Sequence, residues 1–182
     1  MRRVLPIILL FVFATVCMSG CRDAEIRRTL RRMMGSTVVL PENVICVQNG
    51  ESFSLSDSVR HRPKLIIYID STECNTCRIS HIWEYDELFR IAEENRLFDM
   101  VFLMYNTSFE SIPLVRYVSD QNIIHPIYID IENRFLTDNS IIPADSKYHS
   151  FLLTEKGKPI FIGDPTLSPQ MFEAFIFALN DL

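Results

Sequence analysis

Residues 64–82 read KLIIYIDSTECNTCRISHI. The run LIIYI at 65–69 is continuously apolar and rich in β-branched residues, which is typical of a strand buried on both faces of a sheet. A short polar loop follows, and Cys74 and Cys77 then stand where a helix is expected to begin. The stretch therefore predicts a buried strand that leads into a Cys-x-x-Cys pair at the first turn of a helix.

The chain after this stretch alternates strands and helices. We expect a helix from Cys74 to about Asn95, a buried strand at 98–106, a helix at 109–119, a short strand at 125–130, a hairpin of 149–154 with 158–164, and a closing helix at 168–182. The buried stripe of the first helix is expected to contain Ile79, Ile82, Trp83, Leu88, Phe89 and Ile91. Ser168 and Pro169 suit the N-cap and the first position of the closing helix.

The chain before the central strand has a different character. Residues 23–34 have helical spacing, Gly35 ends the pattern, and arginines dominate one face, so this helix is expected to lie near lipid headgroups or to act as a stalk. Residues 36–55 predict short extended pieces, interrupted by Pro41 and by an Asn49-Gly50 turn.

The order of elements is β-α-β-α-β followed by β-β-α, which favours parallel pairing through crossover helices and an antiparallel hairpin at one edge. With Cys-x-x-Cys at the end of the first main strand, this order resembles the thioredoxin fold over residues 36–182. The hairpin segment FLLTEKGKPIFIGD (151–164) is similar to the FLID-x-x-G-x-I segment of that family. The resemblance implies an α/β fold with a central mixed sheet: a parallel βαβ half, a C-terminal β-hairpin plus helix, and flanking helices.

The N-terminus predicts export and a lipid anchor. Met1-Arg2-Arg3 is a positive start, and VLPIILLFVFATV (4–16) is an apolar run too short for a comfortable membrane span. Ser19 and Gly20 before Cys21 resemble the lipobox of bacterial lipoproteins, which implies cleavage before Cys21 and lipidation of its thiol. An ordinary secretory signal or an uncleaved anchor is the alternative. The expected division is a signal peptide at 1–20, an anchored helix or linker at 21–35 and the domain at 36–182.

Composition limits the classes of function. The chain has 182 residues, enough for one domain with a full core, and a formal net charge of −5. No basic face indicates nucleic-acid binding, so no nucleic-acid partner is expected. Once Cys21 is blocked and Cys17 is removed with the signal, Cys46, Cys74 and Cys77 remain in a compartment where disulfides persist. Cys46 lies in an alternating apolar stretch and is expected to be a buried, inert thiol.

A Cys-x-x-Cys pair at the start of a helix suits thiol–disulfide exchange. The helix N-terminus favours thiolate over thiol, and the second thiol lies within reach of a mixed disulfide formed by the first. Cys74, as the first and more exposed thiol, is then the nucleophile, and Cys77 is the resolving residue. Arg78 stands where a haem-attachment motif would have His, which excludes that reading.

Two other readings of the pair stay open. It can be a structural disulfide without turnover, formed by default in an oxidising compartment. With His81 and a distant ligand such as His149 it can also form a zinc or copper site, but the favoured reading has no metal and no cofactor. His81 itself is expected to be a surface residue of the helix.

The sequence departs from the thioredoxin pattern around the dithiol. Glu73 replaces the usual Trp, Asn75 and Thr76 replace Gly-Pro, and the opposing charges of Glu73 and Arg78 leave the sign of the pKa shift of Cys74 open. The family's cis-Pro, which faces the dithiol, is replaced by Tyr148 or His149. A cis bond without Pro costs about 2.5–4 kcal/mol, so a trans turn is expected there.

The sequence therefore predicts a lipid-anchored thiol-disulfide oxidoreductase, facing the periplasm or cell surface of a bacterium and exchanging disulfides with a partner protein. The alternative is a non-catalytic binding module of a cell-envelope assembly, which meets its partner through the surface around Tyr148 and His149. The resemblance alone suggests a reductive or isomerising direction.

Overall fold

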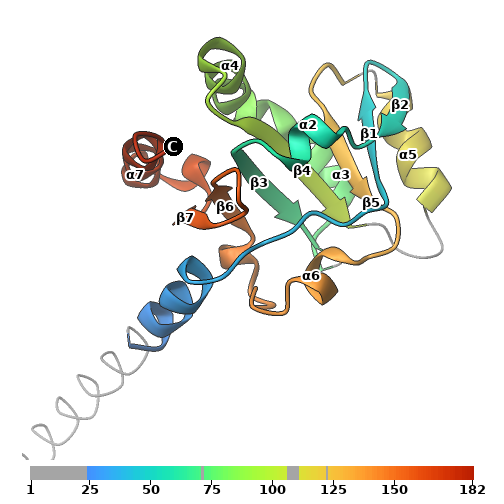
Figure 1. The fold of residues 1–182 in the computed structure, drawn as a ribbon. Coiled ribbons are helices and arrows are strands. Elements are labelled where there is room, and N and C mark those ends of the chain that lie inside the picture. The colour runs from blue at the N-terminus through green and yellow to red at the C-terminus, as the bar shows by residue number, and fades with distance from the viewer. Residues whose placement is uncertain (1–23, 71, 106–110, 122) are drawn as a thin grey trace, which may run out of the picture.

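The computed structural model describes residues 24–70, 72–105, 111–121 and 123–182 (Figure 1). The predicted signal peptide and Cys21 lie outside these residues. Within them, none of the helices is both long and apolar enough to span a membrane.

Seven strands of the described residues form one mixed sheet in the order β2-β1-β5-β4-β3-β6-β7. The strands are β1 (Val44–Gln48), β2 (Glu51–Ser54), β3 (Lys64–Ile69), β4 (Asp99–Tyr105), β5 (Ile127–Asp130), β6 (Ser150–Leu153) and β7 (Pro159–Ile162). Strands β3, β4 and β5 are parallel, as the crossover connections predicted, and β6 and β7 add antiparallel strands beside β3. The α/β class with a parallel half and a C-terminal hairpin is confirmed.

The other edge of the sheet is a second hairpin. Strand β1 pairs antiparallel with both β2 and β5. Asn49 and Gly50 have φ of 51° and 78°, the left-handed conformation that a two-residue hairpin loop requires. The expected turn is confirmed, and the extended pieces around it are full members of the sheet.

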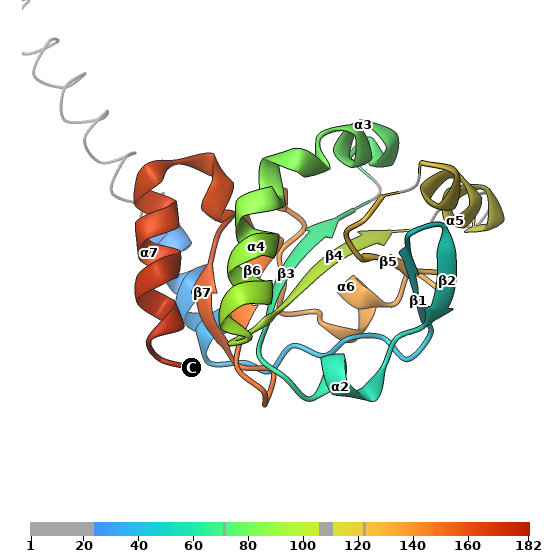
Figure 2. The same cartoon turned by 90° about the horizontal axis from the view of Figure 1, so that it is seen from above.

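Helices cover both faces of the sheet (Figures 1 and 2). They are a helix at 24–34, α2 (Asp57–Arg60), α3 (Asn75–Ser80), α4 (Asp86–Asn95), α5 (Ser111–Asp120), α6 (Phe135–Asp138) and α7 (Pro169–Leu179), with 3-10 turns η1 (Ile82–Tyr85), η2 (Ser146–Tyr148) and η3 (Pro165–Leu167). Ser168 caps α7 by accepting the Met171 N–H at 3.2 Å, and Pro169 begins the helix, as predicted.

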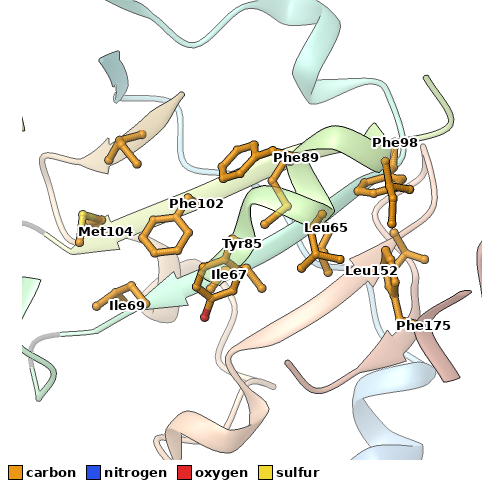
Figure 3. Close-up of a cluster of buried hydrophobic side chains, with 14 of the residues drawn as sticks. Leu65, Ile67, Ile69, Tyr85, Phe89, Phe98, Phe102, Met104, Leu152 and Phe175 are labelled. Carbon is orange, nitrogen blue, oxygen red and sulfur yellow. The ribbon is translucent and has the colours of Figure 1, made fainter. Parts of the chain in front are cut away.

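The alternation of side chains along β3 divides the interior into two cores. Leu65, Ile67 and Ile69 face the core under α4 and α7, where Phe98 and Phe175 meet edge to face with ring centroids 5.5 Å apart (Figure 3). Ile66 and Tyr68 face the opposite core, which contains Met33 of the N-terminal helix and Phe135 of α6. All six residues of β3 are buried, so the strand lies at the centre of the molecule.

The expected single helix from Cys74 to Asn95 is wrong. The chain forms α3, breaks at His81 (φ −109°, ψ 14°), passes through the 3-10 turn η1 and continues as α4. Because a 3-10 turn has three residues per turn instead of 3.6, it changes the face that each later side chain presents. Tyr85 thereby enters the core, whereas Trp83, expected in the buried stripe, is 62% exposed.

Candidate active site

The dithiol lies at the end of the central strand. Asp70 directly follows β3, and its Oδ1 accepts the Thr72 N–H at 2.7 Å and the Thr72 hydroxyl at 2.6 Å. The Glu73 N–H is bonded to the Asp70 carbonyl at 3.2 Å. These bonds close a turn that carries the chain from the buried strand to the surface at Cys74.

Cys74 and Cys77 form a disulfide with their Cα atoms 5.2 Å apart. Cys74 is the N-cap of α3, and its Sγ accepts the Cys77 N–H at 3.3 Å and lies 3.3 Å from the Thr76 hydroxyl. Both cysteine residues are exposed. The sulfur of Cys74 is therefore open to a partner, and a backbone donor already points at it.

Helix α3 is held to the body of the protein by few contacts. Ile79 is its one buried residue. The Asn75 side chain donates to the Tyr105 carbonyl at 2.9 Å, and Asn75 Oδ1 is buried without a partner among the described residues. Thr76, placed between the cysteines, is exposed.

Arg78 connects the dithiol helix to two other parts of the chain. Its guanidinium donates to the Tyr85 hydroxyl at 2.8 Å, and that hydroxyl donates to Asp164 Oδ2 at 2.7 Å. The guanidinium also lies 3.6 Å from Glu73 and 4.0 Å from the same Asp164 oxygen. The positive charge of Arg78 thus lies within ion-pair distance of two carboxylates, those of Glu73 and Asp164.

The surroundings of the dithiol carry more negative than positive groups. Burial raises the pKa of Glu73; Arg78 and His149 lower that pKa, and nearby Asp70 and Asp164 raise it. The opposition between Glu73 and Arg78 inferred from the sequence is therefore present, and Asp70 and Asp164 add to the negative side of the balance.

Tyr148 and His149 are buried directly before β6, with 7% and 1% of their surfaces exposed. The His149 carbonyl accepts the Tyr68 N–H at 2.9 Å. No described peptide bond is cis, so the expected trans turn is confirmed. Neither side chain reaches solvent to an appreciable extent, so a partner that binds the surface around them would contact their neighbours.

The imidazole of His149 faces the carboxylate that follows β3. Its Nε2 lies 2.9 Å from the Pro143 carbonyl, which can only accept, so Nε2 carries a proton. Its Nδ1 lies 3.6 Å from Asp70 Oδ2 and has no hydrogen-bond partner among the described residues. Asp70 therefore stands between His149 on one side and the Glu73–Cys74 turn on the other.

The remaining candidates lie away from this arrangement. The His81 ring is exposed and lies 3.2 Å from Glu84, as expected of a surface residue. Among the described residues no group of three or more His, Cys, Asp or Glu side chains is arranged to hold a metal ion. Cys46 is buried and free, and burial raises the pKa of its thiol to about 11, so the expectation of an unreactive thiol is supported.

The architecture is similar to that of known proteins, although the sequence matches none of them. No family model matches the sequence, and none of the curated proteins does. Two solved structures match at a TM-score of 0.51: a protein from Chlorobium tepidum described as a thiol:disulfide interchange protein DsbE, and one from Aquifex aeolicus VF5 described as an electron transfer protein.

This chain has the thioredoxin-like fold. The Chlorobium protein is 15% identical and the Aquifex protein 12% identical; each match covers 79% of this chain and 96% of the other. The similarity therefore spans nearly the whole length of both solved proteins. At this level of identity the similarity shows the fold alone. The chemistry depends on the residues of this chain.

Sequence reasoning missed three residues of the site: Asp70, Tyr85 and Asp164. Asp70 had a local signal, since a carboxylate directly after a buried strand and four residues before Cys74 has to lie near the dithiol. Tyr85 and Asp164 are 79 residues apart, and no sequence signal connects them.

Proposed function

We propose that this protein is a lipid-anchored thiol-disulfide oxidoreductase that acts outside the cytoplasm and exchanges disulfides with a partner protein. The observation that carries the proposal is the exposed Cys74–Cys77 disulfide, which stands at the N-cap of a short helix directly after the central strand. The thioredoxin-like fold and the name of the Chlorobium protein support the same class of reaction.

In the proposed reaction the reduced pair passes two electrons to the partner. The Cys74 thiolate attacks one sulfur of the partner disulfide, forms a mixed disulfide and releases the other partner sulfur as a thiolate, which takes up a proton. The Cys77 thiol loses its proton and attacks Cys74 Sγ, which re-forms the Cys74–Cys77 disulfide and releases the second partner thiol. Run in reverse, the same steps oxidise a partner dithiol.

The surrounding residues have proposed roles that follow from their contacts. The Cys77 N–H and the Thr76 hydroxyl lie 3.3 Å from Cys74 Sγ and would stabilise a negative charge there. Arg78 would do the same through its charge, while Glu73 opposes it. Asn75 positions α3 through the Tyr105 carbonyl, and Tyr148 and His149 shape the buried side of the site.

The proposed location rests on the sequence before residue 24. The apolar run at 4–16 followed by Ser19-Gly20-Cys21 would direct the chain across a membrane and attach lipid to Cys21. Two or more acyl chains are needed for stable anchoring, which the lipoprotein pathway supplies. Cys21→Ser should abolish acyl labelling and leave the precursor uncleaved or the protein released; unchanged labelling would exclude Cys21.

Trapping tests the exchange reaction in its cellular setting. A Cys77→Ser variant should accumulate mixed disulfides through Cys74, because the resolving thiol is missing, and reductant should release the bound partners. Cys74→Ser/Cys77→Ser is the matched control and should trap none. If both variants trap the same proteins, or neither traps any, the pair does not exchange with a partner, and the structural-disulfide reading holds instead.

A further inference from the structure

The N-terminal helix at 24–34 presents one face to the domain and the opposite face to the outside. Thr29 and Met33 are buried, and Met33 belongs to the same core as Phe135 of α6. This packing fixes the rotation of the helix about its axis. Arg28, Arg31 and Arg32 are exposed, and their spacing of three and four residues places them on one stretch of the outer face.

These three arginines differ from most others in the described part of the chain. The guanidinium groups of Arg90, Arg116 and Arg134 each pair with a carboxylate three or four residues away along the chain. No described residue provides an ion-pair partner for Arg28, Arg31 or Arg32, and Glu25 is the one carboxylate of the described helix. A concentrated positive face thus stands on a protein whose formal net charge is −5.

We propose that Arg28, Arg31 and Arg32 form a docking face for the phosphate headgroups of an anionic bilayer. Guanidinium groups bind phosphate through paired hydrogen bonds, and basic side chains next to a membrane are attracted by its surface potential. The partner is thus a lipid surface rich in phosphatidylglycerol or a similar anionic lipid.

The length of the chain before the helix favours this partner. Two residues, Arg22 and Asp23, lie between Cys21 and Ala24, so the three steps of chain can span at most about 10 Å. The Debye length at physiological ionic strength is about 8 Å. A lipid on Cys21 would therefore keep the start of the helix next to the bilayer. The outer arginines would come within a Debye length of the phosphates when the helix lies along the surface, because Arg28 to Arg32 stand about 6–12 Å further along its axis. This step rests on the proposed anchor, whereas the arginine face itself does not.

The docking face is separate from the dithiol. Figures 1 and 2 both place the N-terminal helix at the β7 end of the molecule, on the opposite face of the sheet from α7, while α3 lies over the end of β3. Docking would thus orient the domain on the membrane without covering Cys74. Substitutions in the arginine face should leave thiol exchange unchanged, which separates failure of this inference from failure of the proposed function.

The test uses the full chain with Cys21→Ser, so that acylation cannot mask the contribution of the arginines. Binding is measured to vesicles of phosphatidylcholine alone and of phosphatidylcholine mixed with phosphatidylglycerol. The ratio of the two affinities cancels the contribution of the apolar run, which every variant retains. At about 1 kcal/mol per basic residue, the triple change Arg28→Gln/Arg31→Gln/Arg32→Gln should lower this ratio about 100-fold.

Two controls separate the arginine face from net charge and from folding. Arg90→Gln/Arg116→Gln/Arg134→Gln removes the same charge from arginines that are already paired and should change the ratio only slightly. Replacing the three docking arginines by Lys should retain most of the preference. A wild-type ratio near one, or an equal loss in both Gln triples, would overturn the inference.

Discussion

The hydrogen bonds that connect helix α3 to the body of the protein can be tested by removing one hydroxyl group, that of Tyr85. Tyr85→Phe removes the group that accepts from Arg78 at 2.8 Å and donates to Asp164 at 2.7 Å. Hydrogen bonds to charged groups contribute about 1.5–3 kcal/mol each, and a buried carboxylate oxygen that loses its donor adds a desolvation cost. The Arg78 guanidinium, 4.0 Å from the same oxygen, can move closer and recover part of the loss.

We therefore expect Tyr85→Phe to lower the free energy of unfolding by about 2 kcal/mol, which corresponds to a fall in Tm of roughly 4–8 °C for a chain of this size. Urea unfolding of the oxidised protein should show a lower midpoint with an unchanged m-value.

Tyr117→Phe is the matched control, because the Tyr117 side chain is half-buried in α5 and its hydroxyl has no hydrogen-bond partner among the described residues. It should cost less than about 0.5 kcal/mol. Equal stabilities of the two variants would show that the hydrogen bonds of Arg78, Tyr85 and Asp164 do not stabilise the fold.

Three further predictions follow from buried or opposing charges. Glu73→Gln should speed alkylation of Cys74 in the reduced protein a few-fold at neutral pH, because it removes the repulsion between the carboxylate and the neighbouring thiolate. Two unit charges about 4 Å apart in water interact by about 1 kcal/mol. Because burial raises the pKa of Glu73, the wild type should also lose stability as pH rises through that pKa, and the Gln variant should not. Cys46→Ala should cost about 1 kcal/mol in stability and leave exchange unchanged, and Cys46, with a thiol pKa of about 11, should be the slowest cysteine to alkylate. Burial lowers the pKa of Lys64 to about 8, so unfolding titrations should show stability rising between about pH 8 and 10.5, by about 3 kcal/mol, and Lys64→Met should remove that rise.

The fold was predictable where local pattern and tertiary structure agree. The apolar run of β3, the Asn49-Gly50 turn and the Ser168-Pro169 start of α7 each carry a signal within a few residues, and each lies where it was expected. Their order along the chain was sufficient to predict the parallel half of the sheet and its C-terminal hairpin.

The helix after Cys74 was not predictable in the same way. Trp83 fits the apolar stripe of a continuous helix, but the break at His81 and the 3-10 turn expose it and bury Tyr85. The break places the Tyr85 hydroxyl within hydrogen-bond distance of Asp164, a residue 79 positions away in the sequence. A helical pattern read residue by residue contains no information on such a partner.

The candidate site shows the same limit. The cysteines and their immediate neighbours could be read from the motif, whereas Asp164 reaches Arg78 only through the folded hairpin. The imidazole of His149 faces Asp70, a contact that the motif alone does not indicate. Residues that meet across the sheet are visible only once the register of β3 with β6 is known.

The most direct test of the central claim is reduction of a model disulfide by the reduced wild-type protein and by Cys74→Ser. The wild type should transfer two electrons per molecule and end as the Cys74–Cys77 disulfide, and Cys74→Ser should lose this reactivity. A wild-type rate no greater than that of Cys74→Ser would exclude thiol–disulfide exchange as the function, because an exposed pair that cannot exchange is only a structural disulfide.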